Sequence, residues 1–196
     1  MYDWDEHYKR GGDSGTTDTK SMGWAHSIYR RYFDNYRDTV IDVGCGDIRA
    51  WDCNPPLKYT GIDISPLIIE QNREKYPGRK FIVANATVPQ KITADIVICM
   101  NVLFHIIGDD DYITILKNLK SYSKKYIIIY TWNKNPFQKG IFSTICKKDT
   151  DGHYQKYRDF KKTANPIFSP HFELVAEHQY PGTIGTLYIW KRENPL

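Results

Sequence analysis

Short apolar runs alternate with helical patterns along the first two thirds of the chain. The runs are rich in β-branched residues and predict strands at residues 39–43, 58–64, 80–84, 94–100 and 126–131. Continuous apolar runs of this length are typical of strands that are buried on both faces of a parallel sheet. Because these strands alternate with helices, the pattern predicts a doubly wound α/β fold.

The helical patterns carry start and stop signals. Ser65 is a good N-cap and Pro66 suits the first helical position, so a helix should begin there and end near Lys75, before Pro77. The acidic residues 109–111 open a second helix with an apolar face. Carboxylates are favoured at a helix start, and we prefer this interpretation to a Mg²⁺ site, so no metal is predicted.

The two ends of the chain follow other patterns. Residues 21–36 are expected to be helical, within an N-terminal helix and lid segment that spans 1–38. Residues 172–180 and 186–191 are strand-like and are joined by Pro181 and Gly182, which predicts an antiparallel hairpin at a sheet edge. Residues 133–170 are expected to form an irregular, substrate-side insertion, and residues 1–196 to form one domain.

Composition narrows the class of protein. The net charge of +4 is mild, and the basic residues are mixed with acidic ones, which argues against a nucleic-acid partner. The four cysteines form no C-x-x-C pair and predict free thiols in a reducing compartment. The polar N-terminus is unlike a signal peptide, and no apolar stretch is long enough to cross a membrane, so we expect a cytoplasmic protein.

The strongest motif is VIDVGCGD at residues 40–47, where a strand runs into a D-x-G-x-G turn. Glycine is needed in such a turn because the backbone bends tightly and approaches a ligand closely. A nicotinamide dinucleotide site would need a third glycine, and Arg49 stands there instead. The sequence therefore predicts a cofactor turn but argues against a dinucleotide.

Two polar residues follow the next two predicted strands. Asp63 lies about 20 residues after the glycine turn, where a carboxylate can accept hydrogen bonds from both ribose hydroxyls. Asp63 could instead cap a helix, but Ser65 already fills that role. Asn85 follows the third strand and is placed to bind an adenine amine, although an ordinary loop asparagine is the competing interpretation.

Together these features resemble the class I S-adenosylmethionine-dependent methyltransferases, from residue 39 to about residue 131. The resemblance implies S-adenosyl-L-methionine as cofactor and a Rossmann-like, seven-stranded, mostly parallel sheet whose last strand is reversed, which agrees with the predicted hairpin. One departure is that Pro55 and Pro56 must cut the first helix short. The cofactor-binding residues it implies are Asp42, Gly44, Cys45, Gly46, Asp63, Ile64, Asn85, Ala86, Asn101, Val102, Ser14 and Gly15.

The N-terminal pattern W-x-x-x-Y-x-x-G-G-x-S-G, from Trp4 to Gly15, is similar to that of a group of small bacterial methyltransferases. NVLFHI and YIIIYTWN add to this narrower resemblance, which favours methyl transfer without defining an acceptor. The glycine-rich residues 11–19 could close over the cofactor as a lid, or form a disordered tail.

The acceptor is expected beyond the fourth strand, at MNVLFHI, because ligands bind outside the carboxyl ends of strands in open α/β sheets. His105 is the candidate catalytic residue, since a hydroxyl acceptor must lose its proton and histidine can take it near neutral pH. The competing interpretation is a histidine packed under the next helix. This stretch also lacks the Asn/Asp-Pro-Pro-aromatic motif of amino-directed nucleic-acid methyltransferases.

Candidate acceptor-binding residues lie in the insertion and just before it. If HYQKYRDFKK is helical, Tyr154 and Arg158 share one face, with Tyr157 beside them. Arginine suits a carboxylate or phosphate, and Trp132 is the remaining candidate. A surface helix without a ligand is the alternative.

The sequence thus predicts an S-adenosylmethionine-dependent methyltransferase that acts on a small molecule at oxygen. An RNA or protein methyltransferase with the same cofactor is one alternative. A non-catalytic module is another, although the intact Gly44, Gly46 and Asp63 argue against it. The acceptor and the oligomeric state stay open.

Overall fold

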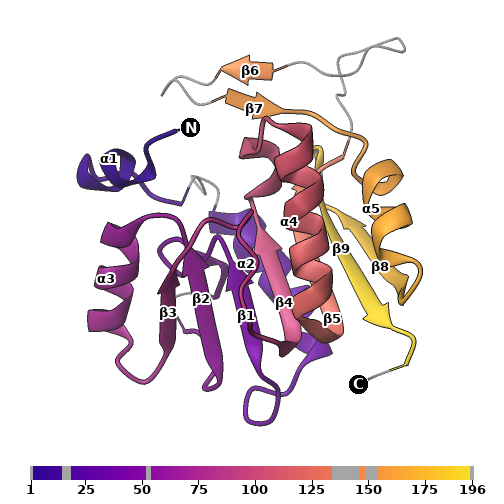
Figure 1. Cartoon of the computed structure of the whole chain (residues 1–196), viewed down its shortest axis with the longest axis horizontal. Coiled ribbons are helices and arrows are strands. Elements are labelled where there is room, and N and C mark those ends of the chain that lie inside the picture. Colours follow the sequence, from indigo (N-terminus) through magenta and orange to yellow (C-terminus); the bar gives the residue numbers. More distant parts are fainter. Residues whose placement is uncertain (1, 15–18, 52–53, 134–145, 149–153, 195–196) are drawn as a thin grey trace.

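The structure is a computed structural model that describes residues 2–14, 19–51, 54–133, 146–148 and 154–194 (Figure 1). Its main sheet comprises β1 (Val40–Val43), β2 (Tyr59–Asp63), β3 (Lys80–Val83), β4 (Ala94–Met100), β5 (Ser123–Trp132), β8 (Phe172–Gln179) and β9 (Gly185–Arg192). Its helices are α1 (Trp4–Lys9), α2 (Thr19–Tyr29), α3 (Pro66–Lys75), α4 (Asp109–Tyr122) and α5 (Phe160–Phe168). Short 3-10 turns are η1 (Arg30–Tyr32), η2 (Arg49–Trp51) and η3 (Leu103–His105), and β6 (Cys146–Lys148) pairs with β7 (Tyr154–Lys156).

The seven-stranded sheet has the order β3-β2-β1-β4-β5-β9-β8. The first five strands are parallel, and β9 pairs antiparallel with both β5 and β8. The predicted mostly parallel sheet with a C-terminal antiparallel hairpin is therefore confirmed.

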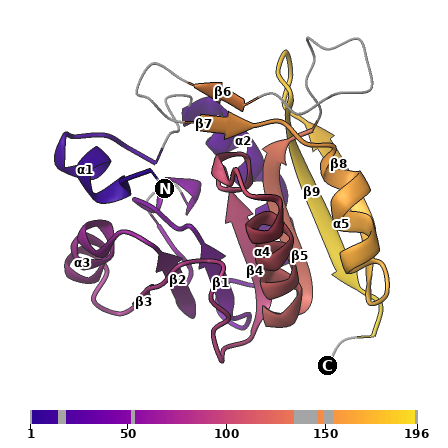
Figure 2. The same cartoon turned by 45° about the horizontal axis from the view of Figure 1, so that its top comes forward.

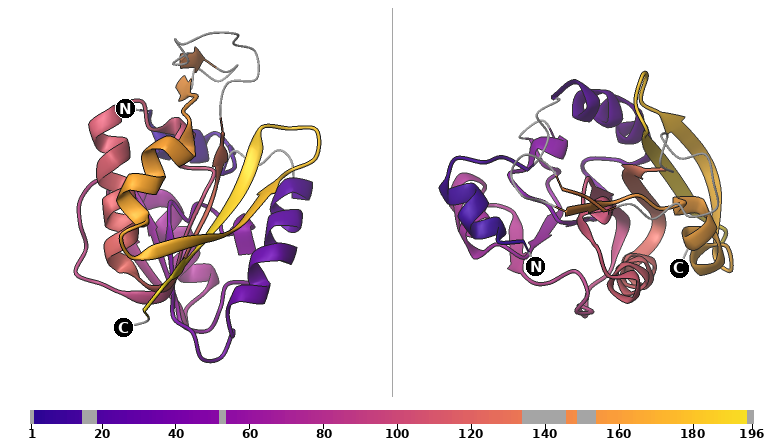
Figure 3. Two further views of the ribbon diagram at one scale, coloured as in Figure 1. Left: turned by 90° about the vertical axis from the view of Figure 1, so that its right-hand side faces the viewer. Right: turned by 90° about the horizontal axis from the view of Figure 1, so that it is seen from above.

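Helices cover both faces of the sheet, as Figure 3 shows. In β1, Ile41 and Val43 pack toward α4 and α5, whereas Val40 packs toward α2 and α3. In β4, Val97 and Cys99 share the first side, and Ile96 and Ile98 share the second. This double burial is why the strands are apolar without alternation.

Several predicted elements have different bounds in the structure. The N-terminal helix is α2, which stops at Tyr29 and continues only as a 3-10 turn to Tyr32, short of the predicted residue 36. Between β1 and β2 the described residues hold only η2, in line with the predicted short first helix.

The prediction that residues 133–170 are irregular is wrong for α5. Asp159 caps this helix by accepting from the Lys162 N–H, and Phe160, Ala164 and Phe168 are buried in the core. The condition that HYQKYRDFKK is helical is not met at Tyr154 and Arg158, because Tyr154 lies in β7 and Arg158 lies between β7 and α5. The two residues therefore do not share a helix face.

The carboxyl ends of β1, β2 and β4 meet at one edge of the sheet, where the strand order reverses between β1 and β4. In Figure 2, α1 and the β6–β7 hairpin stand at this edge. None of the described helices has the length and apolar character that a membrane crossing requires. The edge is where a ligand is expected in a doubly wound sheet.

Candidate functional site

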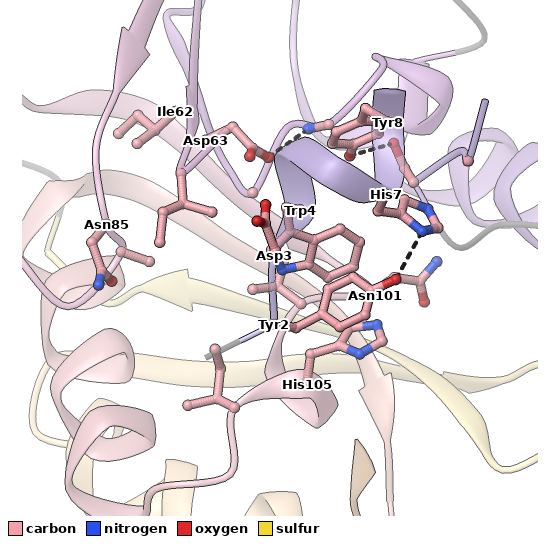
Figure 4. A pocket seen from close by; sticks show the side chains of 18 of the residues that line it. Tyr2, Asp3, Trp4, His7, Tyr8, Ile62, Asp63, Asn85, Asn101 and His105 are labelled. Atoms are coloured by element: carbon pink, nitrogen blue, oxygen red, sulfur yellow. Dashed lines mark hydrogen bonds between the residues drawn. The ribbon is translucent and has the colours of Figure 1, made fainter. Parts of the chain in front are cut away.

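A cavity of about 1070 Å³ opens at this edge (Figure 4). Loops that follow β1, β2, β3 and β4 form one side of it, and the N-terminal segment forms the other. Binding pockets for one drug-sized ligand span roughly 300–1,000 Å³, so this cavity is at the upper end of that range and can hold a cofactor-sized ligand.

The glycine turn after β1 requires both of its glycines. Gly44 has φ +76°, and a Cβ there would lie 2.2 Å from Val102 Cγ2. Gly46 has φ +48°, and its Cβ would lie 2.2 Å from Ser14 Oγ. The buried Asn72 of α3 donates to the Gly46 carbonyl at 2.7 Å and holds the turn in place. Both glycines line the cavity, and their predicted contact with a cofactor stays a prediction.

Asp63, at the end of β2, lines the same cavity and is buried. Its Oδ2 accepts from the Gly46 N–H and its Oδ1 from the Ser65 N–H, each at 3.0 Å. Burial raises the pKa of Asp63 above its ordinary value, and these two N–H groups oppose that shift. Each carboxylate oxygen has a second lone pair, so Asp63 can still accept from two hydroxyl groups of a ligand.

Asp42 was predicted to bind the cofactor, but it does not line the cavity. It is fully buried beneath the turn, where Trp51 Nε1 and the Tyr59 hydroxyl both donate to its Oδ2 at 2.8 Å. Burial raises the pKa of Asp42 to about 7. The structure thus gives this carboxylate a role in tying β1 to η2 and β2.

Most other predicted cofactor residues lie in the cavity wall. Those lining it are Ser14, Ile64, Asn85, Ala86, Asn101 and Val102. Cys45 is buried and is not among the lining residues, and Gly15 lies outside the described residues. Asn85 Oδ1 accepts from the N–H and hydroxyl of Thr87, each at 3.0 Å, which fixes its side chain beside the cavity.

His105 ends η3 and lines the cavity beyond β4. Its ring meets the Trp4 ring edge-on at a centroid distance of 5.3 Å. Figure 4 shows His105 below Trp4 and Tyr2, on the side of the cavity away from Asp63. The predicted base is therefore accessible to a ligand in the cavity, and its catalytic role stays a prediction.

No site role was predicted for the aromatic residues of the N-terminal segment, yet Tyr2, Trp4, His7 and Tyr8 all line the cavity. Tyr2 and His7 bond at 3.0 Å. Burial, with a smaller effect from the charge of Asp63, raises the pKa of Tyr8. Trp4 and Tyr8 belong to the N-terminal motif, which is the one sequence signal that could have found them.

The predicted acceptor residues lie elsewhere. Trp132 stacks between Phe104 and Tyr157, with centroid distances of 4.2 and 5.0 Å, and neither Trp132 nor Tyr157 is among the lining residues. The side chain of Tyr154 lies outside the described residues. Trp132 and Tyr157 therefore stack on Phe104 of η3 without lining the cavity.

Arg158 is bound to that loop. It donates to the Ile106 carbonyl at 2.7 Å, to the Ile107 carbonyl at 2.9 Å and to Asp109 Oδ1 at 2.9 Å. Lys156 also donates to Asp109 Oδ1, at 2.8 Å. Hydrogen bonds from these two cations hold the pKa of Asp109 below its ordinary value. The described residues contain no cluster of acidic, His or Cys side chains fit for a metal.

Comparison with known proteins finds similarity to methyltransferases. Residues 41–125 match a family model described as a methyltransferase domain. Trans-aconitate 2-methyltransferase from Rhodopseudomonas palustris (strain BisA53) is 32% identical over 93 residues, which is 43% of this chain and 33% of that protein. The chain thus spans about a third of the length of the curated relatives it matches.

Solved structures share the fold at low identity. The 1,6-didemethyltoxoflavin-N1-methyltransferase of Burkholderia thailandensis, solved with S-adenosylhomocysteine, has a TM-score of 0.71 at 16% identity, covering 97% of this chain and 86% of that one. Magnesium protoporphyrin IX methyltransferase from Synechocystis PCC 6803 has a TM-score of 0.66 at 14% identity, covering 89% and 83%. Residues 41–125 thus match a methyltransferase-domain model, and the sheet built around them has the fold of these solved methyltransferases.

Proposed function

We propose that the chain binds S-adenosylmethionine in this cavity and transfers its methyl group to a small molecule at oxygen. The observation that carries the proposal is Asp63, a buried carboxylate that lines the cavity beside the glycine turn and keeps acceptor capacity beyond its bonds to the Gly46 and Ser65 N–H groups. The family match over residues 41–125 and the cofactors in related structures support it.

The residues divide the cavity into regions of different chemistry. Gly44, Gly46 and Ser14 line the part suited to the methionine moiety, and Asp63 is suited to the ribose hydroxyls. Ile64, Asn85 and Ala86 surround the part suited to adenine, with an apolar contact and an amide. Asn101, Val102 and His105 then lie on the side from which an acceptor would approach.

When bound, S-adenosylmethionine supplies a methyl group on a positively charged sulfur, which leaves as part of S-adenosylhomocysteine. The protein has to align the acceptor oxygen with that methyl and exclude water. His105 takes the hydroxyl proton as the oxygen–carbon bond forms, and the imidazole becomes imidazolium. The aromatic side chains Tyr2 and Trp4 beside it favour a flat acceptor.

Calorimetric titration with S-adenosylhomocysteine tests the cofactor half of the proposal. Asp63→Ala should weaken binding by roughly 2–4 kcal/mol, because it removes two charge-assisted hydrogen bonds. Asp95→Ala is the matched control, since Asp95 binds Thr39 and Lys125 at the opposite end of the sheet. Equal affinity for wild type and Asp63→Ala would remove Asp63 from the site.

A further inference from the structure

We propose that Arg49 and Asp47 are positioning residues that hold the N-terminal segment, residues 2–14, against the glycine turn and so complete the wall of the cofactor pocket. The inference rests on the proposed function for the identity of the cofactor. Neither residue lines the cavity, so both act through the segment.

The first attachment is a reciprocal pair between Ser14 and Asp47. Ser14 Oγ donates to Asp47 Oδ1 at 2.6 Å and accepts from the Asp47 N–H at 2.8 Å. The side chain of Ser14 reaches this position because Gly46, next to Asp47, has no Cβ. The second glycine of the turn therefore makes room for the N-terminal segment as well as for a ligand.

Arg49 makes the second attachment, and it uses both ends of its guanidinium. Its Nη1 pairs with Asp13, and its Nε lies 2.8 Å from Asp47 Oδ2. The planar guanidinium suits this bridge between two carboxylates, which an ammonium group on a flexible stem would not reproduce. The size of Arg49, taken from the sequence as an obstacle to dinucleotides, thus has a structural use.

The segment is also fixed at its other end and internally. Asp5 of α1 accepts from the Leu67 N–H at 3.2 Å and from the Ser65 hydroxyl, at the start of α3. His7 Nε2 bonds to the Asp13 carbonyl at 2.6 Å. A Cβ at Gly12 would lie 2.4 Å from that nitrogen, so glycine permits the contact. The segment therefore crosses the cavity from α3 to η2.

The consequence concerns ligand release. Trp4 and Tyr8 line the cavity from a segment whose C-terminal end, at Asp13 and Ser14, is bound to Arg49 and Asp47. A ligand held between this segment and Asp63 leaves faster when the ties are broken. Most changes in affinity within one site appear in the dissociation rate.

The experiment measures S-adenosylhomocysteine release by stopped-flow displacement, and amide hydrogen exchange of residues 2–14, on the full chain. Arg49→Ala should release the ligand about tenfold faster and speed exchange in the segment. Asp13→Ala should behave alike, and the double variant should add little, because the two residues form one pair. Arg49→Lys should recover only part of the effect.

Arg37→Ala is the control, because Arg37 pairs with its sequence neighbour Asp34, at 3.8 Å, and 87% of its side chain is exposed. It should match wild type in both measurements. Unchanged exchange in Arg49→Ala would overturn the attachment, and faster exchange with unchanged release would overturn the role in the pocket. If wild type binds no S-adenosylhomocysteine, the proposed function fails, while exchange still decides whether Arg49 holds the segment.

Discussion

An arginine holds each of two walls of the cavity in place, the wall at the glycine turn and the wall formed by the loop after η3, and the two arginines do so in different ways. On the glycine-turn side, Arg49 holds a segment that itself lines the cavity. On the opposite side, Arg158 follows β7 and holds the loop after η3, and that loop rather than the tying segment lines the cavity. An arginine that lies near site residues in the sequence can therefore hold a segment in place rather than bind the ligand.

The two ties also differ in burial. The side chain of Arg158 is 10% exposed and its donors are shared among backbone carbonyls and Asp109, which is 69% exposed. Arg49 is 37% exposed and faces two carboxylates. Because exposed ion pairs contribute little, we expect the Arg49 tie to open more readily than the Arg158 tie.

The largest effect is expected at His105, which the Arg158-bound side presents to the cavity. His105→Gln should lower methyl transfer roughly 100- to 10,000-fold, because an amide cannot take the acceptor proton. S-adenosylhomocysteine affinity should stay within about twofold of wild type. Transfer of a tritiated methyl group to an acceptor found by screening measures the rate.

His178→Gln, on β8 and remote from the cavity, is the control for His105. An unchanged rate in both His105→Ala and His105→Gln would show that the acceptor binds already deprotonated. That result would exclude His105 as the catalytic base, but it would not affect the comparison of the two walls.

The next largest effect is expected from Asp42, which belongs to neither wall. Its pKa is raised to about 7 in the folded protein, above its unfolded value, so the stability it gives at low pH is lost as pH rises through 7. The free energy of unfolding should fall by about 2–3 kcal/mol between about pH 5 and pH 8 through this group. Asp42→Asn should flatten that dependence in urea titrations, and an unchanged slope would contradict it.

Gly46→Ala tests the glycine-turn wall at its closest approach. A left-handed alanine costs roughly 1–2 kcal/mol, and its Cβ would also displace Ser14. We expect about tenfold weaker S-adenosylhomocysteine binding by calorimetry, partly restored in Gly46→Ala/Ser14→Gly. Gly182→Ala is the control, because Gly182 has φ +74° with open space around it. If Gly182→Ala weakened binding equally, the contact with Ser14 would not be the cause.

Local signals predicted the elements that depend on neighbours in sequence. Ser65 and Pro66 fixed the start of α3, and the apolar run fixed β4 at the predicted bounds. The position of Asp63 at the cavity could be predicted because the end of a strand is a local feature that points to the sheet edge. Asp42 carried the same kind of motif, but its partner Tyr59 lies on the next strand, which only the folded sheet brings near.

The ties between distant segments could not be predicted in this way. Asp13 meets Arg49 across 36 positions, and Arg158 meets the Ile106 carbonyl across 52. Backbone carbonyls carry no sequence signal. Arg158 was therefore predicted to bind a carboxylate or phosphate of the acceptor, whereas in the structure it binds carbonyls of the loop after η3. Residues of α5 were hidden because the helix is short and contains Pro166.

The smallest effect on cofactor binding is expected from Arg158→Ala. This variant gives the most direct comparison with Arg49→Ala, because each variant removes the arginine that holds one wall. The variant loses hydrogen bonds to the loop after η3, but water can reach exposed Ile107 and Gly108, and Lys156 still pairs with Asp109. The cost in unfolding free energy should therefore be only about 1–2 kcal/mol. S-adenosylhomocysteine release should stay at the wild-type rate, unlike in Arg49→Ala, because the N-terminal segment, residues 2–14, keeps its contacts with Arg49 and Asp47.

Thermal unfolding and stopped-flow release measure the two quantities, with Arg158→Lys expected between wild type and alanine in stability. Lost acceptor binding in Arg158→Ala with unchanged stability would instead make Arg158 a ligand of the acceptor, and the contrast between the two arginines would disappear.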